Sequence, residues 1–287
     1  MKYYPRISIV TPSFNDVRFL EAAITSLLDQ QYPNLEYIVI DGGSTDGSVE
    51  LIEKYSDKLA YWVSEKDEGM YHAISKGFER CSGEIMGWLN SDDRHYPGSL
   101  FAIAQLFSDI PAVQWLQGLP SVINETDRVL YAAPRKDINR FHFYERKYVG
   151  NKGFIQQEST FWTRNLWTMA GGYISRDFKL AGDFDLWVRF FKHANLYRAP
   201  VLLGAFRMSG EDQLSISRYD DYVKESFRSL ETNSLSPSDQ TKLKKYKTTM
   251  RIRRAINKWL DRIFPIGDTG IADDIKYDFK TGKYKIR

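Results

Sequence analysis

The chain has 287 residues, of which 43% are hydrophobic and 15% aromatic; this is enough to bury a core as one large domain, or one domain with an appendage, and excludes a disordered or collagen-like chain. Its single cysteine, Cys81, excludes an intramolecular disulfide and a metal site built from several thiolates. The formal net charge of +3 is uneven, because residues 242–262 hold nine basic residues and one acidic residue, a local +8 that leaves −5 on the remainder, and this division indicates two functional parts and argues against a nucleic-acid-binding protein.

Over the first hundred residues, short apolar runs alternate with longer amphipathic stretches. We expect strands at residues 7–10, 35–40, 60–63 and 84–89, separated by helices at 17–28, 48–55 and 69–78. This alternation is typical of βαβ units. The sequence therefore predicts an α/β fold built on a parallel sheet.

The second half of the chain has a less regular pattern. Residues 112–123 are expected to be extended, and residues 124–152 to form a connection of loops and short pieces. Residues 160–170, the pair Gly171-Gly172 and residues 184–193 are predicted as strand, turn and helix, followed by a late strand at 195–203.

Polar residues recur where the predicted strands end. Thr11 and Pro12 close the first strand, Asp41 follows the second, and Asp92 and Asp93 follow the fourth. In an open α/β sheet, the carboxyl ends of the strands form the edge where ligands bind. Paired carboxylates offer hard oxygen ligands to Mg²⁺ or Mn²⁺, so a metal-bound nucleotide diphosphate would fit this edge.

Each of these aspartates also has a purely structural explanation, because Asp is a favoured residue in turns and at helix N-caps. Asp46 is best explained as the N-cap of the helix that follows it. Asp183 and Asp185 open another predicted helix, where the first can cap and the second can interact with the helix dipole. The residues alone do not choose a catalytic base between these two.

Taken together, these motifs resemble those of glycosyltransferase family 2, the inverting group with the GT-A fold that makes bacterial polysaccharides. The resemblance runs from Ile7 to about Ser217, through TPSFN at 11–15, DGGSTDGS at 41–48, DEGMYHA at 67–73, NSDD at 90–93, GGY at 171–173 and GDFDLW at 182–187. It implies a Rossmann-like, mainly parallel sheet flanked by helices, to which this chain adds a C-terminal helical extension. It also implies an enzyme that moves a sugar from a nucleotide-sugar, chiefly a UDP-sugar, with Mn²⁺ or Mg²⁺, to an acceptor hydroxyl in polysaccharide or glycolipid synthesis.

The resemblance assigns a role to each motif position. It gives the nucleotide-sugar site to Thr11, Pro12, Asp41, Asp67 and Asp92, the metal to Asp93 and the catalytic base to Asp183. Asp67 would begin a loop that closes on the nucleotide. Asp183 would take the proton of the acceptor hydroxyl while that oxygen attacks the anomeric carbon from behind.

Three positions depart from the family pattern. The common D-x-D motif is represented by Ser91-Asp92-Asp93, Ser209 stands where family members often carry a histidine that helps to bind the metal, and Gly182 replaces the acid that usually precedes the catalytic aspartate. These changes leave open a weakened or metal-independent enzyme.

A basic amphipathic helix is predicted at about 241–264, with Trp259 on its apolar face. Such a helix can lie in the headgroup region of an anionic membrane, and it can equally pack on the catalytic domain with a solvated basic face. No run approaches the roughly 20 apolar residues of a membrane span, and the N-terminal sequence lacks the apolar run of a signal peptide. We therefore expect a cytoplasmic protein, either free or peripheral at the cytoplasmic face of the membrane.

The expected organisation is a catalytic domain over residues 1–217, with a nucleotide-sugar half at about 1–110 and an acceptor half at about 111–217, and an extension over 218–287. The expected partners are the donor, a sugar or lipid-linked acceptor and a membrane surface, without nucleic acid. Two alternatives remain: a non-catalytic GT-A scaffold that binds nucleotide or a partner protein, and a nucleotidyltransferase. The latter would need a Gly-rich loop with Arg or Lys after the first strand, and residues 11–15 are not such a loop.

Overall fold

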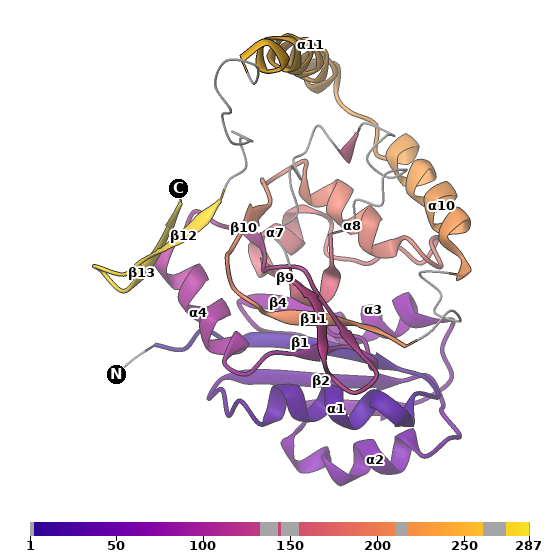
Figure 1. Ribbon diagram of the computed structural model, residues 1–287. Coiled ribbons are helices and arrows are strands. Elements are labelled where there is room, and N and C mark those ends of the chain that lie inside the picture. The colour runs from indigo at the N-terminus through magenta and orange to yellow at the C-terminus, as the bar shows by residue number, and fades with distance from the viewer. Residues whose placement is uncertain (1–2, 133–142, 145–154, 210–216, 261–273, 287) are drawn as a thin grey trace.

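In the computed structural model, which describes residues 3–132, 143–144, 155–209, 217–260 and 274–286, a central sheet carries helices on both faces (Figure 1). The helices are α1 (Val17–Leu28), α2 (Ser48–Lys54), α3 (Met70–Arg80), α4 (Ser99–Asp109), α7 (Arg164–Met169), α8 (Gly182–Phe190), α10 (Tyr219–Thr232) and α11 (Pro237–Leu260), with short 3₁₀ turns at Ser56–Lys58 and Gln157–Ser159. The strands are β1 (Ile7–Ser13), β2 (Leu35–Asp41), β3 (Tyr61–Ser64), β4 (Ile85–Trp88), β5 (Arg94–His95), β6 (Trp115–Gln117), β7 (Ser121–Asn124), β8 (Val129–Ala132), β9 (Thr160–Thr163), β10 (Tyr197–Arg198), β11 (Gly204–Met208), β12 (Ile275–Asp278) and β13 (Lys283–Ile286).

The main sheet has seven strands in the order β10-β6-β9-β4-β1-β2-β3. β1 to β4 are mutually parallel, and only β9 runs antiparallel to its neighbours β4 and β6. Successive strands build outward from β1 through β2 to β3, and the chain then returns to place β4 on the other side of β1. The order therefore switches between β1 and β4, the point at which α/β sheets bind ligands.

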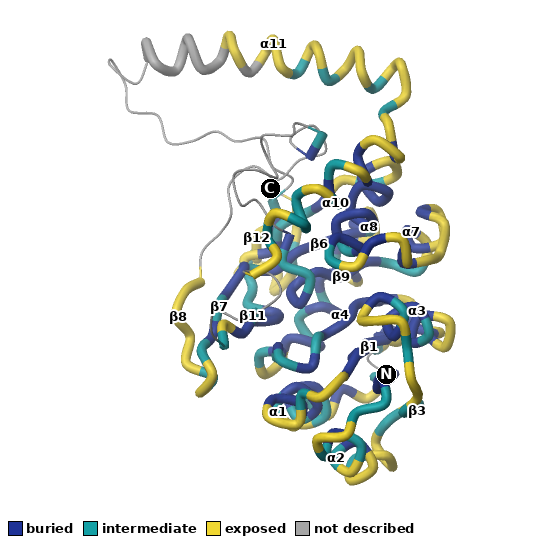
Figure 2. The backbone as a smooth tube through the Cα atoms, turned by 90° about the vertical axis from the view of Figure 1, so that its right-hand side faces the viewer, coloured by how far each residue is buried: buried dark blue, intermediate teal, exposed yellow. Residues whose placement is uncertain are grey.

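Both faces of the sheet are covered, which explains why all seven residues of β1 are buried. One face packs on α1 and α4 through residues such as Ile9 and Leu20. The other packs on α3, α7 and α8 around five tryptophans: Trp88, Trp115, Trp162, Trp167 and Trp187. Trp187 of α8 is stacked on Trp88 of β4, with ring centroids 5.8 Å apart and planes 7° from parallel. The buried interior is dark blue in Figure 2.

The strands and helices predicted for the first hundred residues are confirmed, with small shifts at their ends. The second half differs more. The stretch 160–170, predicted as a strand, forms β9 and then helix α7, because Thr163 accepts a hydrogen bond from Leu166 N–H and caps a new helix. The late strand predicted at 195–203 shrinks to β10, and most of the connection at 124–152 lies outside the described residues.

A second sheet of four short strands, ordered β5-β11-β7-β8, was not predicted from the sequence. β11 pairs antiparallel with β5, which immediately follows the Asp92-Asp93 pair, and parallel with β7. This small sheet therefore brings residues near position 207 to the loop after β4.

Among the described residues, the chain after β11 forms two helices, α10 and α11, and one hairpin. α10 packs on α8, whereas α11 stands away from the body and its described side chains are exposed or half-buried (Figures 1 and 2). The basic helix predicted at about 241–264 begins earlier than expected, at Pro237. Its predicted end at residues 261–264 lies outside the described part of the chain. β12 and β13 form a hairpin against α4. Among the described helices, none combines the length and apolar character needed to cross a membrane.

Candidate active site

The sequence-predicted site residues gather from the carboxyl ends of β1, β2, β3 and β4 and from the first turn of α8. Thr11 and Pro12 lie in β1, and both are buried. The Thr11 hydroxyl lies 3.0 Å from the Tyr37 hydroxyl of β2, so its hydrogen bond is made within the sheet. Thr11 therefore links β1 to β2 next to the proposed site.

Asp41 ends β2 with a fully buried carboxylate. Oδ2 accepts hydrogen bonds from the N–H groups of Gly43 (3.0 Å) and Ser44 (2.8 Å) and from the Ser64 hydroxyl of β3 (2.7 Å). Oδ1 accepts one from the Ser44 hydroxyl at 2.5 Å. Asp41 thus fixes the turn after β2 and ties it to β3.

Asp67 lies half-buried in the loop after β3, against the turn after β2. Its Oδ1 accepts a hydrogen bond from Gly69 N–H at 2.7 Å. A Cβ added to Gly42 would stand 2.9 Å from Asp67 Oδ2 and 3.2 Å from the ring of Phe14, whose side chain is largely exposed. Gly42 is therefore the residue that lets these two loops meet.

The Asp92-Asp93 pair is held by Arg207 of β11. The Arg207 N–H donates to Asp93 Oδ1 (2.8 Å), and its Nε donates to the Asp92 carbonyl (2.6 Å). The guanidinium also donates to the Asn124 carbonyl (2.8 Å) and to Asp127 Oδ1 (2.6 Å), and it lies over the Phe19 ring. This buried cation therefore sits directly beneath the acidic loop.

Asp93 itself is only 1% exposed, and its Oδ2 is a buried oxygen without a hydrogen-bond partner among the described residues. Burial, together with the neighbouring charges of Asp92 and Glu158, holds the pKa of Asp93 well above its usual range. A buried carboxylate oxygen without a hydrogen-bond partner is a suitable ligand for a hard divalent ion. The described residues contain no group of three His, Cys, Asp or Glu side chains close enough to hold an ion by themselves.

Asp16, just after β1, is a member of this acidic edge that the sequence interpretation missed. Burial raises its pKa to about 6, a hydrogen bond from Ser91 lowers it, and the charges of Asp92 and Asp46 raise it further. Its position after a strand and before a helix was readable from the sequence. Asp46 holds the starts of two helices, since it accepts hydrogen bonds from Val17 N–H (2.9 Å) and Ser48 N–H (3.0 Å).

Asp183 lies in the first turn of α8, half-buried. The Tyr71 hydroxyl of α3 lies 3.2 Å from Asp183 Oδ1 and 2.9 Å from the Leu180 carbonyl. Burial raises the pKa of Asp183 to about 6, against hydrogen bonds from Phe184 N–H and Tyr71 that lower it. A carboxylate with a pKa near neutrality is suited to accept a proton in a reaction.

The absence of an acid before Asp183 has a steric explanation. A Cβ at Gly182 would stand 2.9 Å from three atoms of the Tyr71 ring. The ring of Tyr71 therefore lies where the customary acidic side chain would begin. This departure from the family pattern reflects packing between α3 and α8.

α10 supports the same helix, although it lies beyond the predicted domain boundary at 217. Glu225 accepts hydrogen bonds from the N–H groups of Leu180 (2.8 Å) and Ala181 (3.0 Å), directly before α8. Asp185, expected to interact with the helix dipole, is instead buried: its Oδ1 accepts hydrogen bonds from Ser229 of α10 and from Asn233, the residue directly after α10. The loop that carries Asp183 thus depends on α10.

Two cavities flank Tyr173, of about 310 and 390 Å³. The first lies between α3, α7 and the loop at 172–177, and the second between that loop and α10. Neither is lined by any of the predicted nucleotide-sugar, metal or base residues.

Comparison with known proteins supports the family resemblance seen in the sequence. The family model described as "Glycosyl transferase family 2" matches residues 8–178. An uncharacterized glycosyltransferase of Mycobacterium tuberculosis, Rv1514c, is 32% identical over 203 residues, which cover 69% of this chain and 72% of that protein.

Two solved structures share the architecture. TarS 1-349 of S. aureus in complex with UDP-GlcNAc has a TM-score of 0.62 at 14% identity, over 83% of this chain and 70% of that one. The mannosyltransferase PcManGT of Pyrobaculum calidifontis, in complex with GDP-Man and Mn²⁺, has a TM-score of 0.59 at 18% identity, over 82% and 67%. At such identities the likeness shows the fold, and the predicted GT-A type of α/β fold is confirmed.

Proposed function

Because this chain belongs to glycosyltransferase family 2, we propose that it is an inverting enzyme that transfers a sugar from a nucleotide-sugar, chiefly a UDP-sugar, to an acceptor hydroxyl. The observation that carries the proposal is the position of Asp183: a half-buried carboxylate with a pKa of about 6, in contact with Tyr71 of α3, the helix that follows the Asp67 loop. At neutral pH most Asp183 side chains are ionised, and their proton affinity is high enough to accept the proton of an acceptor hydroxyl.

In the proposed reaction, the acceptor oxygen attacks the anomeric carbon from the face opposite the leaving group. A carbon–oxygen bond to the acceptor forms, and the bond from the anomeric carbon to the diphosphate oxygen breaks. The proton of the acceptor hydroxyl passes to the Asp183 carboxylate, and the nucleoside diphosphate leaves with the bonding electrons. A single displacement inverts the configuration and needs no covalent enzyme intermediate.

We assign the donor to the edge formed by the loops after β1, β2, β3 and β4. Asp67 and Asp92, which are not fully buried, are the proposed contacts to the nucleotide-sugar. Thr11, Pro12 and Asp41 contribute by shaping the pocket, because they are buried and Asp41 already accepts four hydrogen bonds from its surroundings. The donor half at about 1–110 and the acceptor half at about 111–217 remain our proposed division.

Mn²⁺ or Mg²⁺ fits this edge if Asp93, with its unsatisfied Oδ2, and Asp92 supply the protein's ligands. Since the described residues offer no third side chain of the usual kind, the diphosphate and water would complete the coordination. The ion would neutralise charge on the departing diphosphate. Arg207 adds a fixed positive charge beneath the same loop.

The proposed acceptor is a sugar or lipid-linked sugar of polysaccharide or glycolipid synthesis. The exposed basic side chains of α11, including Lys244, Lys245 and Arg251, support contact with an anionic membrane on which such an acceptor would be carried. Residues 1–217 remain the proposed catalytic domain, but its helix α8 requires α10 as well.

Calorimetric titration of the purified protein with UDP, GDP and dTDP, each with Mn²⁺ and with a chelator, tests the donor assignment. We expect UDP to bind most tightly and to need the metal. Asp57→Asn, which alters an exposed aspartate far from the edge, serves as the control for Asp93→Asn. Failure of every nucleotide to bind would refute the proposal.

A further inference from the structure

The hairpin of β12 and β13 is a feature that the proposed transfer reaction does not use. Its strands pair Ile275 with Ile286, Lys276 with Lys285, Tyr277 with Tyr284 and Asp278 with Lys283. The Asp278 carbonyl accepts hydrogen bonds from the N–H groups of Thr281 (3.2 Å) and Gly282 (2.8 Å), and Gly282 adopts φ +66°, which a glycine accommodates without strain.

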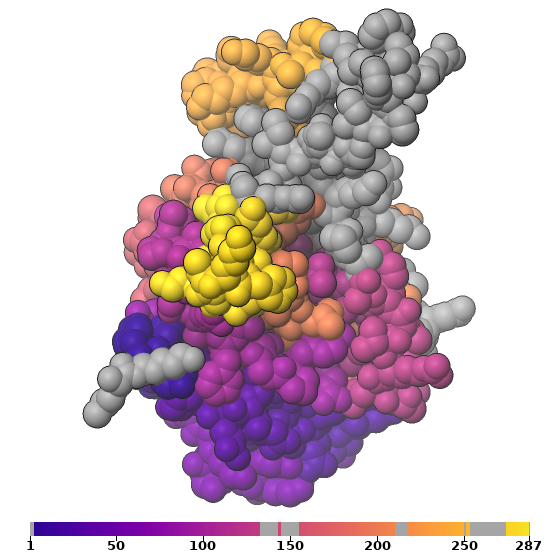
Figure 3. Space-filling model, turned by 60° about the vertical axis from the view of Figure 1, so that its left-hand side comes forward, coloured from indigo at the N-terminus to yellow at the C-terminus, as the bar shows by residue number. Residues whose placement is uncertain are grey.

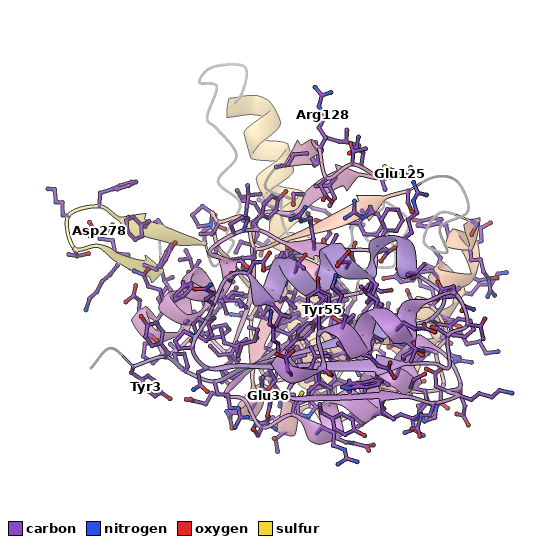
Figure 4. All side chains as sticks on the ribbon, turned by 90° about the horizontal axis from the view of Figure 1, so that it is seen from below. Tyr3, Glu36, Tyr55, Glu125, Arg128 and Asp278 are labelled. Carbon is purple, nitrogen blue, oxygen red and sulfur yellow. The ribbon has the colours of Figure 1, made fainter. Side chains whose placement is uncertain are left out.

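The hairpin is attached to the body through its turn, through β13 and at its base. Gln105 of α4 donates to the Gly282 carbonyl at 2.9 Å, and Asp109 accepts from Tyr284 N–H at 2.8 Å. Ile275 is buried in the core cluster beside α4, and Asp274 pairs with Arg198 of β10 at 2.8 Å. It is therefore a fixed projection of the body, and Figure 4 shows its Asp278 well away from the sheet.

The two faces of the hairpin have opposite character, because directly paired residues share a face. One face carries Ile275, Tyr277, Tyr284 and Ile286. The other carries Lys276, Asp278, Lys283 and Lys285. Lys285 pairs with Asp278 at 2.6 Å, whereas Lys276, Lys280 and Lys283 are exposed and have no ion-pair partner among the described residues.

The tip of the hairpin exposes an aromatic side chain. Phe279 is 90% exposed and touches Tyr277 edge to face, with ring centroids 5.2 Å apart. Most of the Phe279 ring remains in water, and the direct pairing of Lys276 with Lys285 is unfavourable because like charges lie opposite one another. An aromatic tip beside uncompensated lysines is instead suited to a surface with an apolar interior and anionic headgroups.

We propose that this hairpin docks on an anionic lipid bilayer, with Phe279 entering the interfacial region and Lys276, Lys280 and Lys283 contacting headgroups. The hairpin stands forward from the body on a side where the exposed basic helix α11 lies above it (Figure 3). This inference rests on the part of the proposed function that places the enzyme at a membrane. It adds a rigid second contact, which would set the orientation of the body toward the membrane.

Flotation of the full chain with vesicles of phosphatidylcholine alone, or mixed with phosphatidylglycerol, tests the proposal. We expect the wild type to float only with the mixed vesicles. Phe279→Ser should weaken partition by about tenfold, and the triple change Lys276→Gln, Lys280→Gln, Lys283→Gln by about a hundredfold. The matched controls are Leu130→Ser, on the exposed strand β8, and the triple change Lys58→Gln, Lys179→Gln, Lys224→Gln, which removes the same charge elsewhere on the surface.

A dye attached to Phe279→Cys gives an independent readout. Cys81 is buried, so an environment-sensitive thiol dye should label position 279 selectively. A blue shift on mixing with the anionic vesicles is expected. Equal flotation of the hairpin variants and their controls, or the absence of a dye shift, would overturn the proposal. Calorimetry with UDP on the same proteins separates this failure from failure of the proposed function.

Discussion

The Tyr71 hydroxyl lies 3.2 Å from Asp183 Oδ1, and the Tyr71 ring covers Gly182. One residue of α3 thus contacts both the proposed base and the position where an acid would usually precede it. Because Tyr71 follows the Asp67 loop by only a few residues, this contact joins the donor edge to the first turn of α8. A substitution at Tyr71 should therefore change the pKa of Asp183.

Tyr71→Phe should move the acid limb of the transfer rate to higher pH. The hydrogen bond from Tyr71 lowers the pKa of Asp183, which burial raises to about 6, so removing it should raise that pKa. A base is active when deprotonated, and the variant should therefore lose about threefold in kcat/KM at pH 6 and little at pH 8. The pH dependence of kcat/KM measures this.

Glu225→Gln provides the opposite control. The charge of Glu225 raises the pKa of Asp183, so the neutral variant should shift the acid limb to lower pH. Equal shifts in the same direction for both variants would show that the limb reports another group. Asp183→Asn should abolish the limb with the activity.

Gly182→Ala should destabilise the protein although alanine favours a helix, because the new Cβ meets the Tyr71 ring at 2.9 Å. We expect a loss of about 1–3 kcal/mol in urea unfolding. In a Tyr71→Ala background the same change should be neutral or slightly stabilising. If alanine costs the same with and without the ring, the steric explanation fails.

Asp93→Asn should have opposite effects on stability and on nucleotide binding. The folded-state pKa of Asp93 is raised, so its ionised form opposes folding at neutral pH, and the wild type should gain stability as the pH falls toward the unfolded-state value. The neutral variant should melt a few degrees higher at about pH 8 without metal, and lack that pH dependence. It should also lose the stabilisation that UDP with Mn²⁺ gives the wild type.

Thermal melts at two pH values, with and without UDP and Mn²⁺, check both parts. Asp57→Asn, an exposed aspartate, is the control and should change neither. A lower melting temperature for Asp93→Asn at about pH 8 without metal would contradict the view that the buried, unsatisfied carboxylate of Asp93 destabilises the wild type.

Arg207→Met should cost about 3–5 kcal/mol, because it removes a buried guanidinium that holds the Asp92 loop and Asp127. Arg94→Met is the matched control: Arg94 also pairs with Asp127, but its side chain is 31% exposed, and the expected cost is about 0–1 kcal/mol. Urea unfolding of the two variants measures the difference. Similar costs would mean that Arg207 acts through its surface ion pair alone.

The first hundred residues could be predicted because their signals are local: each helix and strand carries its own periodicity and its own turn residues. The small sheet could not be predicted, since β5 has two residues and pairs with β11 more than a hundred positions later. Arg207 lies two residues before Ser209, the expected histidine position, and nothing local indicates that its guanidinium reaches Asp92.

Two site features show different limits of sequence reasoning. Asp16 shares the strand-end position that singled out the other aspartates, and the same argument could have included it. The Tyr71–Asp183 contact could not be foreseen, because it joins positions 112 residues apart. The steric reason for a glycine at position 182 also could not be foreseen, because it depends on where the Tyr71 ring lies in the folded protein.

The buried pair of Asp185 and Arg189, 2.9 Å apart on α8, depends on α10 through Ser229 and Asn233. A shuffled gene joining this α8 to a foreign α10 would leave a buried anion with too few donors. The two helices must therefore be inherited together, and a recombination point between α8 and Asn233 would separate this buried carboxylate from its hydrogen-bond donors.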